Sequence, residues 1–377
     1  MKGRPTDHRN LDLTAFNLDV VRRRAGGRVI WQPRIGCWLT DKLFADQPLP
    51  APYTGMTMSQ IYRSLGCSNR VYDFGACFRS QEDPAVRIGE RQLNETDTET
   101  LIETPVGRQR AVHRRHPSNR YRPETLKWEM SDEAEIRVGA WREERRTWSW
   151  DQAAYERLSK EWAGLGAPTM CVPRTNVQKL YLETMGVPGA IFALADNPAA
   201  LERYFEALTV TEDRLMDVIA ASPVEIINFG DNVHAATLSP ALFRKYVLPR
   251  YQQRCARLHA AGKFVNAHWD GNCRPLLPMA RNTGLDGIEA ITPIPQGDVT
   301  LEETKAALGD IFLVDGIPAV YFDKTFSTRT LLDCAQKCID LFAPHLVLGI
   351  SDEISSTGDI ERIRRVGELV DDYNASV

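Results

Sequence analysis

The chain has 377 residues, of which 43% are hydrophobic and 25% charged, a balance that is ordinary for globular proteins. Its formal net charge of −4 argues against a dedicated nucleic-acid-binding protein, because such proteins carry a strongly basic surface. The eight cysteines show no CxxC spacing, which predicts reduced thiols. No secretory leader and no apolar stretch of roughly 18 residues is evident, so we expect a cytoplasmic protein without membrane or nucleic-acid partners.

The N-terminal half is less regular than the rest and contains a long polar segment. Between about residues 87 and 150 the pattern is hairpin-like, and we interpret this segment as a polar β-hairpin insertion. It carries an arginine run that comprises Arg108, Arg110, Arg114, Arg115, Arg120 and Arg122. Two interpretations stay open: the run is a solvated decoration, or it forms a lid or homodimer surface that attracts an anionic ligand or partner.

Five short apolar runs in the C-terminal half predict buried β-strands. They cover residues 225–231, 263–268, 287–291, 311–315 and 345–351, and each is too short for a buried helix. Helical segments separate them: Ser239 and Pro240 open one helix, and Thr300 and Glu303 fit a capping box. Strands that alternate with helices build right-handed parallel units. We therefore expect a single α/β domain over residues 1–377, a (β/α)8 TIM barrel with the β-hairpin insertion.

Acidic and polar residues end each of these predicted strands. They are Asp231 and Asn232, then His268 and Asp270, then Glu289, then Asp315, and finally Ser351 and Asp352. In α/β barrels the catalytic groups lie at the C-terminal ends of the strands. Some of these acids are also placed to cap the helices that follow. We predict that this rim is the active site.

The segment of residues 266–273 is the sharpest local feature. His268 and Asp270 are two apart on a strand, so both side chains point to one side and reach one cation. Glu289, at the next strand end, is the expected third ligand, which would leave an open catalytic position. Cys273 is a further donor candidate. The alternative is a hydrogen-bonded pair of His268 and Asp270 that positions a substrate without metal.

The order of several motifs carries a family resemblance. Residues 229–232, 238–249, 262–271, 284–289 and 349–353 together resemble the uroporphyrinogen decarboxylase superfamily, over roughly residues 195–375. True decarboxylases of that superfamily carry an arginine-rich loop near the N-terminus. Here residues 31–37 stand in its place, and only Arg34 corresponds. The chain is more similar to the zinc-dependent methyltransferase branch, which has a His-x-Cys pair where this sequence has His268 and Asp270.

The resemblance implies a methyltransferase that moves a methyl group from a small methylated substrate, such as an aryl methyl ether, to a corrinoid protein or tetrahydrofolate. Zn²⁺ held by His268, Asp270 and Glu289 would stabilise the leaving heteroatom. We expect catalytic roles for Asp231, His234, Asp315 and Asp352, and substrate binding by Asn232, Arg34, Trp269 and Ser351. The alternative is a metal-independent decarboxylase or lyase of a small or porphyrinogen-like acid.

Overall fold

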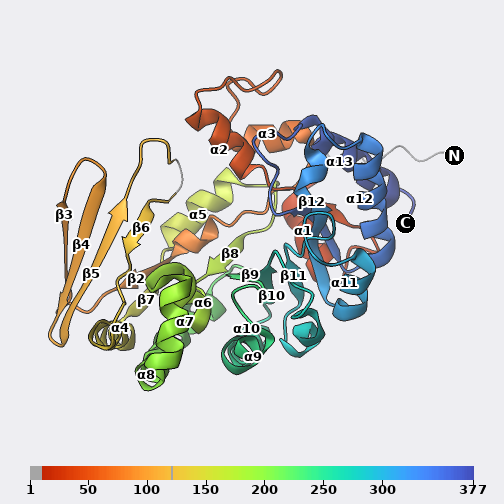
Figure 1. Ribbon diagram of the computed structural model, residues 1–377. Coiled ribbons are helices and arrows are strands. Elements are labelled where there is room, and N and C mark those ends of the chain that lie inside the picture. Colours follow the sequence, from red (N-terminus) through yellow and green to blue (C-terminus); the bar gives the residue numbers. More distant parts are fainter. Residues whose placement is uncertain (1–10, 120–121) are drawn as a thin grey trace. The chain divides into compact units, whose positions relative to one another are not determined.

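The computed structural model describes residues 11–119 and 122–377 (Figure 1). The chain divides into two compact units. The first contains the described part of Met1–Gly75 together with Gln152–Val172 and Pro223–Val377. The second contains Ala76–Asp151 and Pro173–Ser222. Among the described helices, none combines the length and apolar character that a membrane crossing needs.

The first unit is built on a sheet of seven parallel strands. Their spatial order is β1-β13-β12-β11-β10-β9-β8. The strands are β1 (Ile30–Trp31), β8 (Thr169–Val172), β9 (Ile226–Val233), β10 (Phe264–Trp269), β11 (Gly287–Glu289), β12 (Phe312–Pro318) and β13 (Leu346–Ser351). The five strands predicted in the C-terminal half are thus confirmed as adjacent and parallel, and the fold is TIM-barrel-like.

The segment 68–73 lies between β1 and β8, the two edge strands of this sheet. The amide of Ser68 donates to the carbonyl of Trp31 in β1 at 3.0 Å, and the amide of Thr169 in β8 donates to that of Val71 at 3.1 Å. Val71 also forms a parallel bridge with Pro168. The segment therefore supplies the eighth position of the barrel wall.

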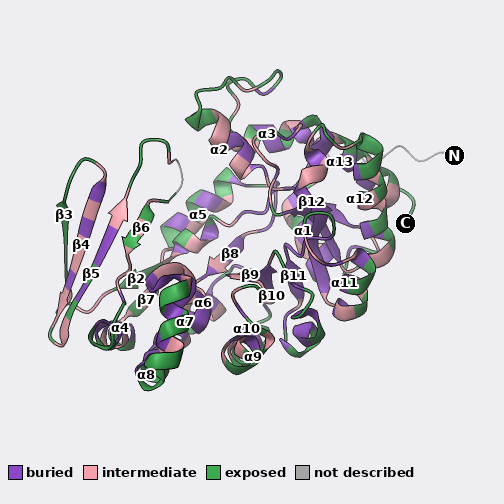
Figure 2. Cartoon of the chain, in the orientation of Figure 1, coloured by how far each residue is buried: buried purple, intermediate pink, exposed green. Residues whose placement is uncertain are grey.

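Helices follow the strands and cover the outside of the sheet (Figure 1). They are α1 (Leu13–Val21), α2 (Gly36–Phe44), α3 (Met58–Leu65), α5 (Gln152–Glu161), α9 (Pro240–Leu242), η4 (Phe243–Val247), α10 (Leu248–Ala260), η5 (Leu277–Asn282), α11 (Leu301–Leu308), η6 (Ala319–Phe322), α12 (Thr328–Phe342) and α13 (Glu361–Asn374). The predicted helix starts are confirmed: Ser239 accepts from the amide of Leu242, and Thr300 and Glu303 form the capping box. Figure 2 shows the strands β9–β12 buried beneath these helices.

The second unit combines antiparallel strands with helices. A four-stranded sheet has the order β3 (Arg87–Gln92), β4 (Asp97–Thr104), β5 (Gly107–Arg114) and β6 (Glu124–Lys127), and β2 (Phe78–Gln81) pairs with β7 (Thr147–Trp150). The helices are α4 (Glu133–Arg145), α6 (Asn176–Lys179), the π-helical turn η3 (Leu180–Thr184), α7 (Gly186–Asp196) and α8 (Pro198–Ala221), and the turn η2 (Phe74–Cys77) precedes β2 in the chain.

The predicted hairpin segment differs from the structure in its last third. The hairpins are present between residues 87 and 127, but α4 occupies residues 133–145. Asp132 caps this helix by accepting from the amide of Glu135. The helix is highly polar, and its charged residues Arg142 and Glu143 are nevertheless buried. A pattern search for an apolar stripe therefore overlooks it.

The arginines of β5 are paired with carboxylates of β4. Arg108 contacts Glu103 at 2.9 Å, Arg114 contacts Asp97 at 2.7 Å, and Arg110 pairs with Glu99. Such matched pairs leave little net positive charge on that part of the run. Arg120 lies outside the described residues.

Candidate active site

A buried guanidinium group connects two of the predicted strand-end acids. Arg70 donates from Nη1 to Oε1 of Glu289 at 2.9 Å and from Nη2 to Oδ1 of Asp315 at 2.7 Å. Its Nη1 also donates to Oδ2 of Asp315 at 3.1 Å, and its Nε donates to Oε1 of Gln32 at 3.1 Å. Arg70, Glu289 and Asp315 are all buried. A side chain at the end of β11 and one in the middle of β12 thus meet inside the barrel.

Arg34 is the second cation of this cluster. Its Nη1 lies 3.5 Å from Oε1 of Glu289, and its Nη2 lies 4.0 Å from Oδ2 of Asp315. Its Nε donates to the backbone carbonyl of Asp352 at 2.9 Å, and the two side chains form an ion pair. The predicted residues Arg34, Asp315 and Asp352 are therefore brought together.

Glu289 stays ionised because its neighbours compensate for burial. Burial alone would raise the pKa of this carboxyl group, but Arg70, His268 and Arg34 outweigh it and hold the pKa well below the ordinary value. Its oxygens also accept hydrogen bonds from the hydroxyl of Tyr72 and the amide of Asn228. A buried carboxylate with this many donors is a fixed negative charge at the centre of the site.

His268 lies between two carboxylates. Its Nδ1 is 3.5 Å from Oε1 of Glu289, and its Nε2 is 3.8 Å from Oδ2 of Asp270. Burial favours the neutral imidazole, but Asp270 and Glu289 outweigh it and raise the pKa of His268 to about 9. His268 is therefore an imidazolium at neutral pH.

Two buried polar atoms in this part of the site have no hydrogen-bond partner among the described residues. They are Nε2 of His268 and Oδ1 of Asp270. Buried polar atoms are normally paired, so such a pair of atoms marks a place for water or a substrate atom. Burial raises the pKa of Asp270, but His268, His234 and Asn232 reverse this and lower it. The predicted residues Asn232 and His234 thus join the site through Asp270.

The expected zinc ligands do not converge on one point in this structure. Asp270 lies beside Nε2 of the imidazole, whereas Glu289 lies beside Nδ1, so a cation on one nitrogen faces only one of the two acids. Both oxygens of Glu289 are already taken by Arg70, Tyr72 and Asn228. Among the described residues no group of three His, Cys, Asp or Glu side chains is placed to hold a metal ion. His268, Asp270 and Glu289 are therefore not arranged in this structure to hold the predicted Zn²⁺ together.

Three predicted residues have other surroundings. Asp231 is fully buried. The pKa of Tyr251 in α10 is raised, first by the burial of the tyrosine and then by the nearby carboxylate of Asp231. The ring of Trp269 packs edge-on against Phe243, 5.3 Å away, and is itself fully buried. The Ser351 hydroxyl accepts from the amide of Gly316 at 3.0 Å and donates to a backbone carbonyl at 3.3 Å. These residues contact the supporting framework in the structure, and their proposed roles toward substrate stay predictions.

Arg70, Tyr72 and Asn228 were not predicted from the sequence as site residues. Arg70 and Tyr72 are two residues apart, so on an extended segment both point to the same side. The run from Asn69 to Asp73 shows no polar–apolar alternation, so the sequence carries little strand signal there. In the structure this segment forms only isolated bridges and not a full strand.

Comparisons with known proteins agree with this fold. A model of the family described as uroporphyrinogen decarboxylase (URO-D) matches residues 184–312, about a third of the chain. No curated protein matches this chain significantly. The expected resemblance to the uroporphyrinogen decarboxylase superfamily is thereby confirmed over residues 184–312.

Solved structures provide a second comparison. A methyltransferase from Methanosarcina mazei superposes with a TM-score of 0.50 at 11% identity, covering 96% of this chain and 91% of that one. Two structures of the pneumococcal exo-β-D-N-acetylglucosaminidase StrH align with TM-scores of 0.36, at 13% and 14% identity, over 60% of this chain and 63% of theirs. At these identities the first likeness shows the fold alone, and the other two carry no argument.

Proposed function

We propose that this chain is a methyltransferase that takes a methyl group from a small, uncharged methylated substrate such as an aryl methyl ether. The observation that carries the proposal is the charge balance of the buried cluster. Two guanidinium groups and the imidazolium of His268 face the carboxylates of Glu289, Asp315, Asp270 and Asp352. Such a site has no surplus positive charge with which to bind a carboxylate-rich substrate.

This balance disfavours the alternative decarboxylase. The donors of Arg70 are engaged with Gln32, Glu289 and Asp315, and Arg34 forms ion pairs with Asp352 and Glu289. A porphyrinogen-like acid would have to displace these buried ion pairs, and a broken buried pair costs about 3–5 kcal/mol. An uncharged ether oxygen has no such requirement.

His268 has the chemistry that methyl transfer from an ether needs. In the step we propose, the acceptor's electron pair forms a bond to the methyl carbon while the methyl–oxygen bond breaks. The bond pair remains on the leaving oxygen, and the proton on Nε2 of His268 moves to it. The product is an alcohol or phenol, and solvent returns a proton to the imidazole. Asp270, whose Oδ2 lies 3.8 Å from Nε2, orients the imidazolium, and its Oδ1 has no hydrogen-bond partner among the described residues.

The remaining parts of the site would position these groups. Glu289 lies beside Nδ1 of the imidazole ring, so the proton on Nε2 lies at the other edge of the ring, next to Asp270. Asn232 and His234 act on Asp270. The acceptor, a corrinoid protein or tetrahydrofolate, is part of the proposal and rests on the family resemblance.

The test is turnover with defined compounds. We would incubate the purified chain with guaiacol, an uncharged aryl methyl ether, and free cob(I)alamin, and follow methylcobalamin by its absorption spectrum and catechol by chromatography. We expect both products in equal amounts. Carbon dioxide release from a carboxylate substrate without methyl transfer would instead establish the decarboxylase.

Metal analysis of the same protein decides how the leaving oxygen is stabilised. We expect substoichiometric zinc and activity that survives a chelator. Stoichiometric zinc that leaves together with activity, and is lost in His268→Ala, would assign the stabilisation to a metal and overturn the proton-donor role of His268.

A further inference from the structure

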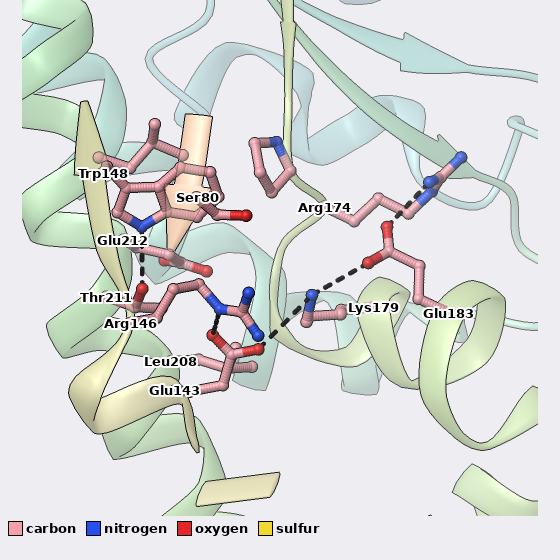
Figure 3. Close-up of a pocket in the computed structure, with 12 residues that line it drawn as sticks. Ser80, Glu143, Arg146, Trp148, Arg174, Lys179, Glu183, Leu208, Thr211 and Glu212 are labelled. Carbon is pink, nitrogen blue, oxygen red and sulfur yellow. Dashed lines mark hydrogen bonds and ion pairs between the residues drawn. The ribbon is translucent and has the colours of Figure 1, made fainter. Parts of the chain in front are cut away.

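A cavity of about 260 Å³ in the second unit is lined by a network of charged groups that are already paired with one another (Figure 3). Glu143 contacts Nε of Arg146 at 3.0 Å and lies 3.8 Å from Nζ of Lys179. Glu183 lies 3.0 Å from both Lys179 and Arg174. These pairs are mostly shielded from solvent, so a charged ligand would have to break them. The network accounts for its own charges without a ligand.

Another cavity, of about 340 Å³, lies within the first unit. It is lined by residues of α1, of α5 and the turn that follows it, and of the segments that precede β8 and β9. Helix α1 shares a core cluster with Ile30, Ile226 and Phe312, the first residues of β1, β9 and β12. The cavity therefore lies at the N-terminal end of the strands, whereas Glu289 and His268 lie at or near their C-terminal ends. The proposed methyl transfer uses none of the residues that line it.

The lining of this cavity is mainly apolar and includes the aromatic side chains of Phe74, Tyr155 and Trp162. The ring centroids of Phe74 and Tyr155 lie 5.7 Å apart. Nε1 of Trp162 donates to Oδ2 of Asp73 at 2.9 Å, and this hydrogen bond holds the indole ring in place. Aromatic rings attract another ring through their faces and edges, beyond the gain from burial alone. The lining therefore favours a ligand that contains a ring of this kind.

One hydroxyl group in the lining has no partner. Oγ of Ser159 is buried, and no described residue forms a hydrogen bond with it. Ser159 follows Tyr155 by four residues on α5, so both side chains lie on the same face of the helix. Thr14, which also lines the cavity, is satisfied: its hydroxyl accepts from the amide of Gly164 at 3.1 Å and donates to the carbonyl of Gly166 at 3.0 Å. Buried polar atoms are normally paired, so Oγ of Ser159 marks a place for one hydrogen bond from a ligand.

Two carboxylates line the cavity, and both are already engaged. Asp12 caps α1 by accepting from the amides of Thr14 and Ala15 at 2.9 and 3.2 Å. Glu225 forms an ion pair with Arg22, whose Nε donates to it at 2.9 Å. Among the described residues no cation lines the cavity. An anion would therefore be repelled, and a cation would have to compete with Arg22 and with the helix cap.

We propose that this cavity binds a small, neutral aromatic molecule with one hydroxyl group, of the phenol class. The ring would pack against Phe74, Tyr155 and Trp162, and the hydroxyl would donate to Oγ of Ser159. The size is sufficient, because an apolar protein cavity of about 150 Å³ already takes up benzene, and this one measures about 340 Å³. A charged group on the ligand would gain nothing from a lining whose carboxylates are engaged.

The experiment is calorimetric titration of the full chain with phenol and three comparison compounds. Cyclohexanol keeps the hydroxyl but lacks the aromatic ring, and benzoate and benzylammonium keep the ring but carry a charge. We expect phenol to bind at least threefold more tightly than cyclohexanol and at least tenfold more tightly than either charged compound. Equal or tighter binding of any comparison compound would overturn the proposal, and so would the absence of phenol binding at millimolar concentration.

Variants show which site the phenol occupies, because a phenol is also a product of the proposed methyl transfer. Ser159→Leu fills the cavity and should abolish phenol binding. Ser159→Ala keeps the cavity but removes the hydrogen bond, so phenol affinity should fall about fivefold. Without phenol, the thermal midpoint of Ser159→Ala should equal or exceed that of the wild type, because the change removes a buried polar atom that lacks a partner. Lys160→Ala is the control, since Lys160 is exposed on the same helix and does not line the cavity.

Phenol binding that stays unchanged in Ser159→Leu would place the phenol elsewhere in the molecule and overturn this site, while leaving the proposed methyl transfer untouched. If Ser159→Leu does not fold, Ser159→Ala decides alone. Unchanged phenol affinity in Ser159→Ala, or the same loss in Lys160→Ala, would likewise overturn the proposal.

Discussion

Glu289 is fully buried, and its charge is balanced by Arg70, Arg34 and His268. A single carboxylate therefore contacts three cations, and each of these cations also contacts another acid of the rim. Asp315 also contacts Arg70, and its backbone φ is 92°. Residues other than glycine rarely adopt this φ. Strained backbone at a buried charged cluster is typical of functional sites, because the surrounding structure must hold it in place.

Gly349 leaves the space in which Arg70 and Asp315 pair. A Cβ atom there would lie 2.2 Å from Oδ1 of Asp315, 3.0 Å from the carbonyl of Gln32 and 3.1 Å from Nη2 of Arg70. We expect Gly349→Ala to lower the free energy of unfolding by about 3 kcal/mol, because it pushes apart a buried ion pair. Urea denaturation measures the change.

The control for that variant is Gly367→Ala in α13. Its added Cβ would lie 3.5 Å from the nearest atom, in Trp31, which is ordinary contact, and alanine favours a helix by roughly 1 kcal/mol over glycine. Gly367→Ala should therefore be neutral or stabilising. If Gly349→Ala behaves in the same way, the Arg70–Asp315 pair is not rigidly held.

His268 should control the alkaline limb of the pH–rate profile. Because the pKa of His268 is raised to about 9, methyl transfer should be constant near neutrality and fall about tenfold for each pH unit above that value. His268→Gln should lose roughly 10²- to 10⁴-fold in kcat and show no such limb.

His259→Gln is the matched control, since His259 is exposed and pairs with Asp286 at 2.8 Å. It should retain the wild-type profile. An alkaline limb that persists unchanged in His268→Gln would show that another group donates the proton.

At the scale of helices and strands, α4 depends on one capping residue. Asp132 accepts from the amide of Glu135 in the first turn of the helix. Asp132→Ala should cost about 1 kcal/mol of unfolding free energy, whereas Asp132→Ser keeps a capping oxygen and should stay within a few tenths. Thermal denaturation of both variants measures this, and equal loss in both would rule out capping as the cause.

The arginines on β5 provide a test of the hairpin surface. Arg108 and Glu103 are exposed, with 73% and 39% of their side chains accessible, so their contact stabilises little. Arg108→Glu with Arg110→Glu should leave methyl-transfer activity within about threefold of wild type. A tenfold rise in KM, with wild-type KM that depends on salt, would instead identify this surface as a ligand or partner site.

The strands were predictable because buried parallel strands are short apolar runs. The runs 287–291 and 345–351 agree with the bounds of β11 and β13 to within two residues. α4 was not predictable in the same way, since its buried positions include Arg142 and Glu143 held by ion pairs. Helix periodicity is read from apolar residues, and a helix buried through charge escapes it.

The candidate site was predictable only in part for a similar reason. His268, Asp270, Glu289 and Asp315 were found because they lie at or near the ends of clear apolar runs in the sequence. Arg70 contacts two of these side chains, but its partners lie more than 200 residues away in the sequence. The tertiary structure also determines that Nδ1 of His268 faces Glu289 and that Nε2 faces Asp270. This arrangement decides whether the three side chains can bind one metal ion.

For the whole molecule, the protonation of His268 links stability to pH. The folded pKa of about 9 exceeds the unfolded value of 6.5, so the folded state binds more protons between these values and stability falls as pH rises. The contribution of His268 protonation to the free energy of unfolding should be complete below pH 6.5 and lost by about pH 9. This difference in pKa between the folded and unfolded states corresponds to about 3 kcal/mol of unfolding free energy. Urea denaturation at pH 6 and pH 9.5 should therefore show a larger loss in wild type than in His268→Gln, which lacks the titrating group. Equal losses in the two proteins would mean that the buried imidazole is neutral in the fold, and the proton-donor mechanism would fail with it.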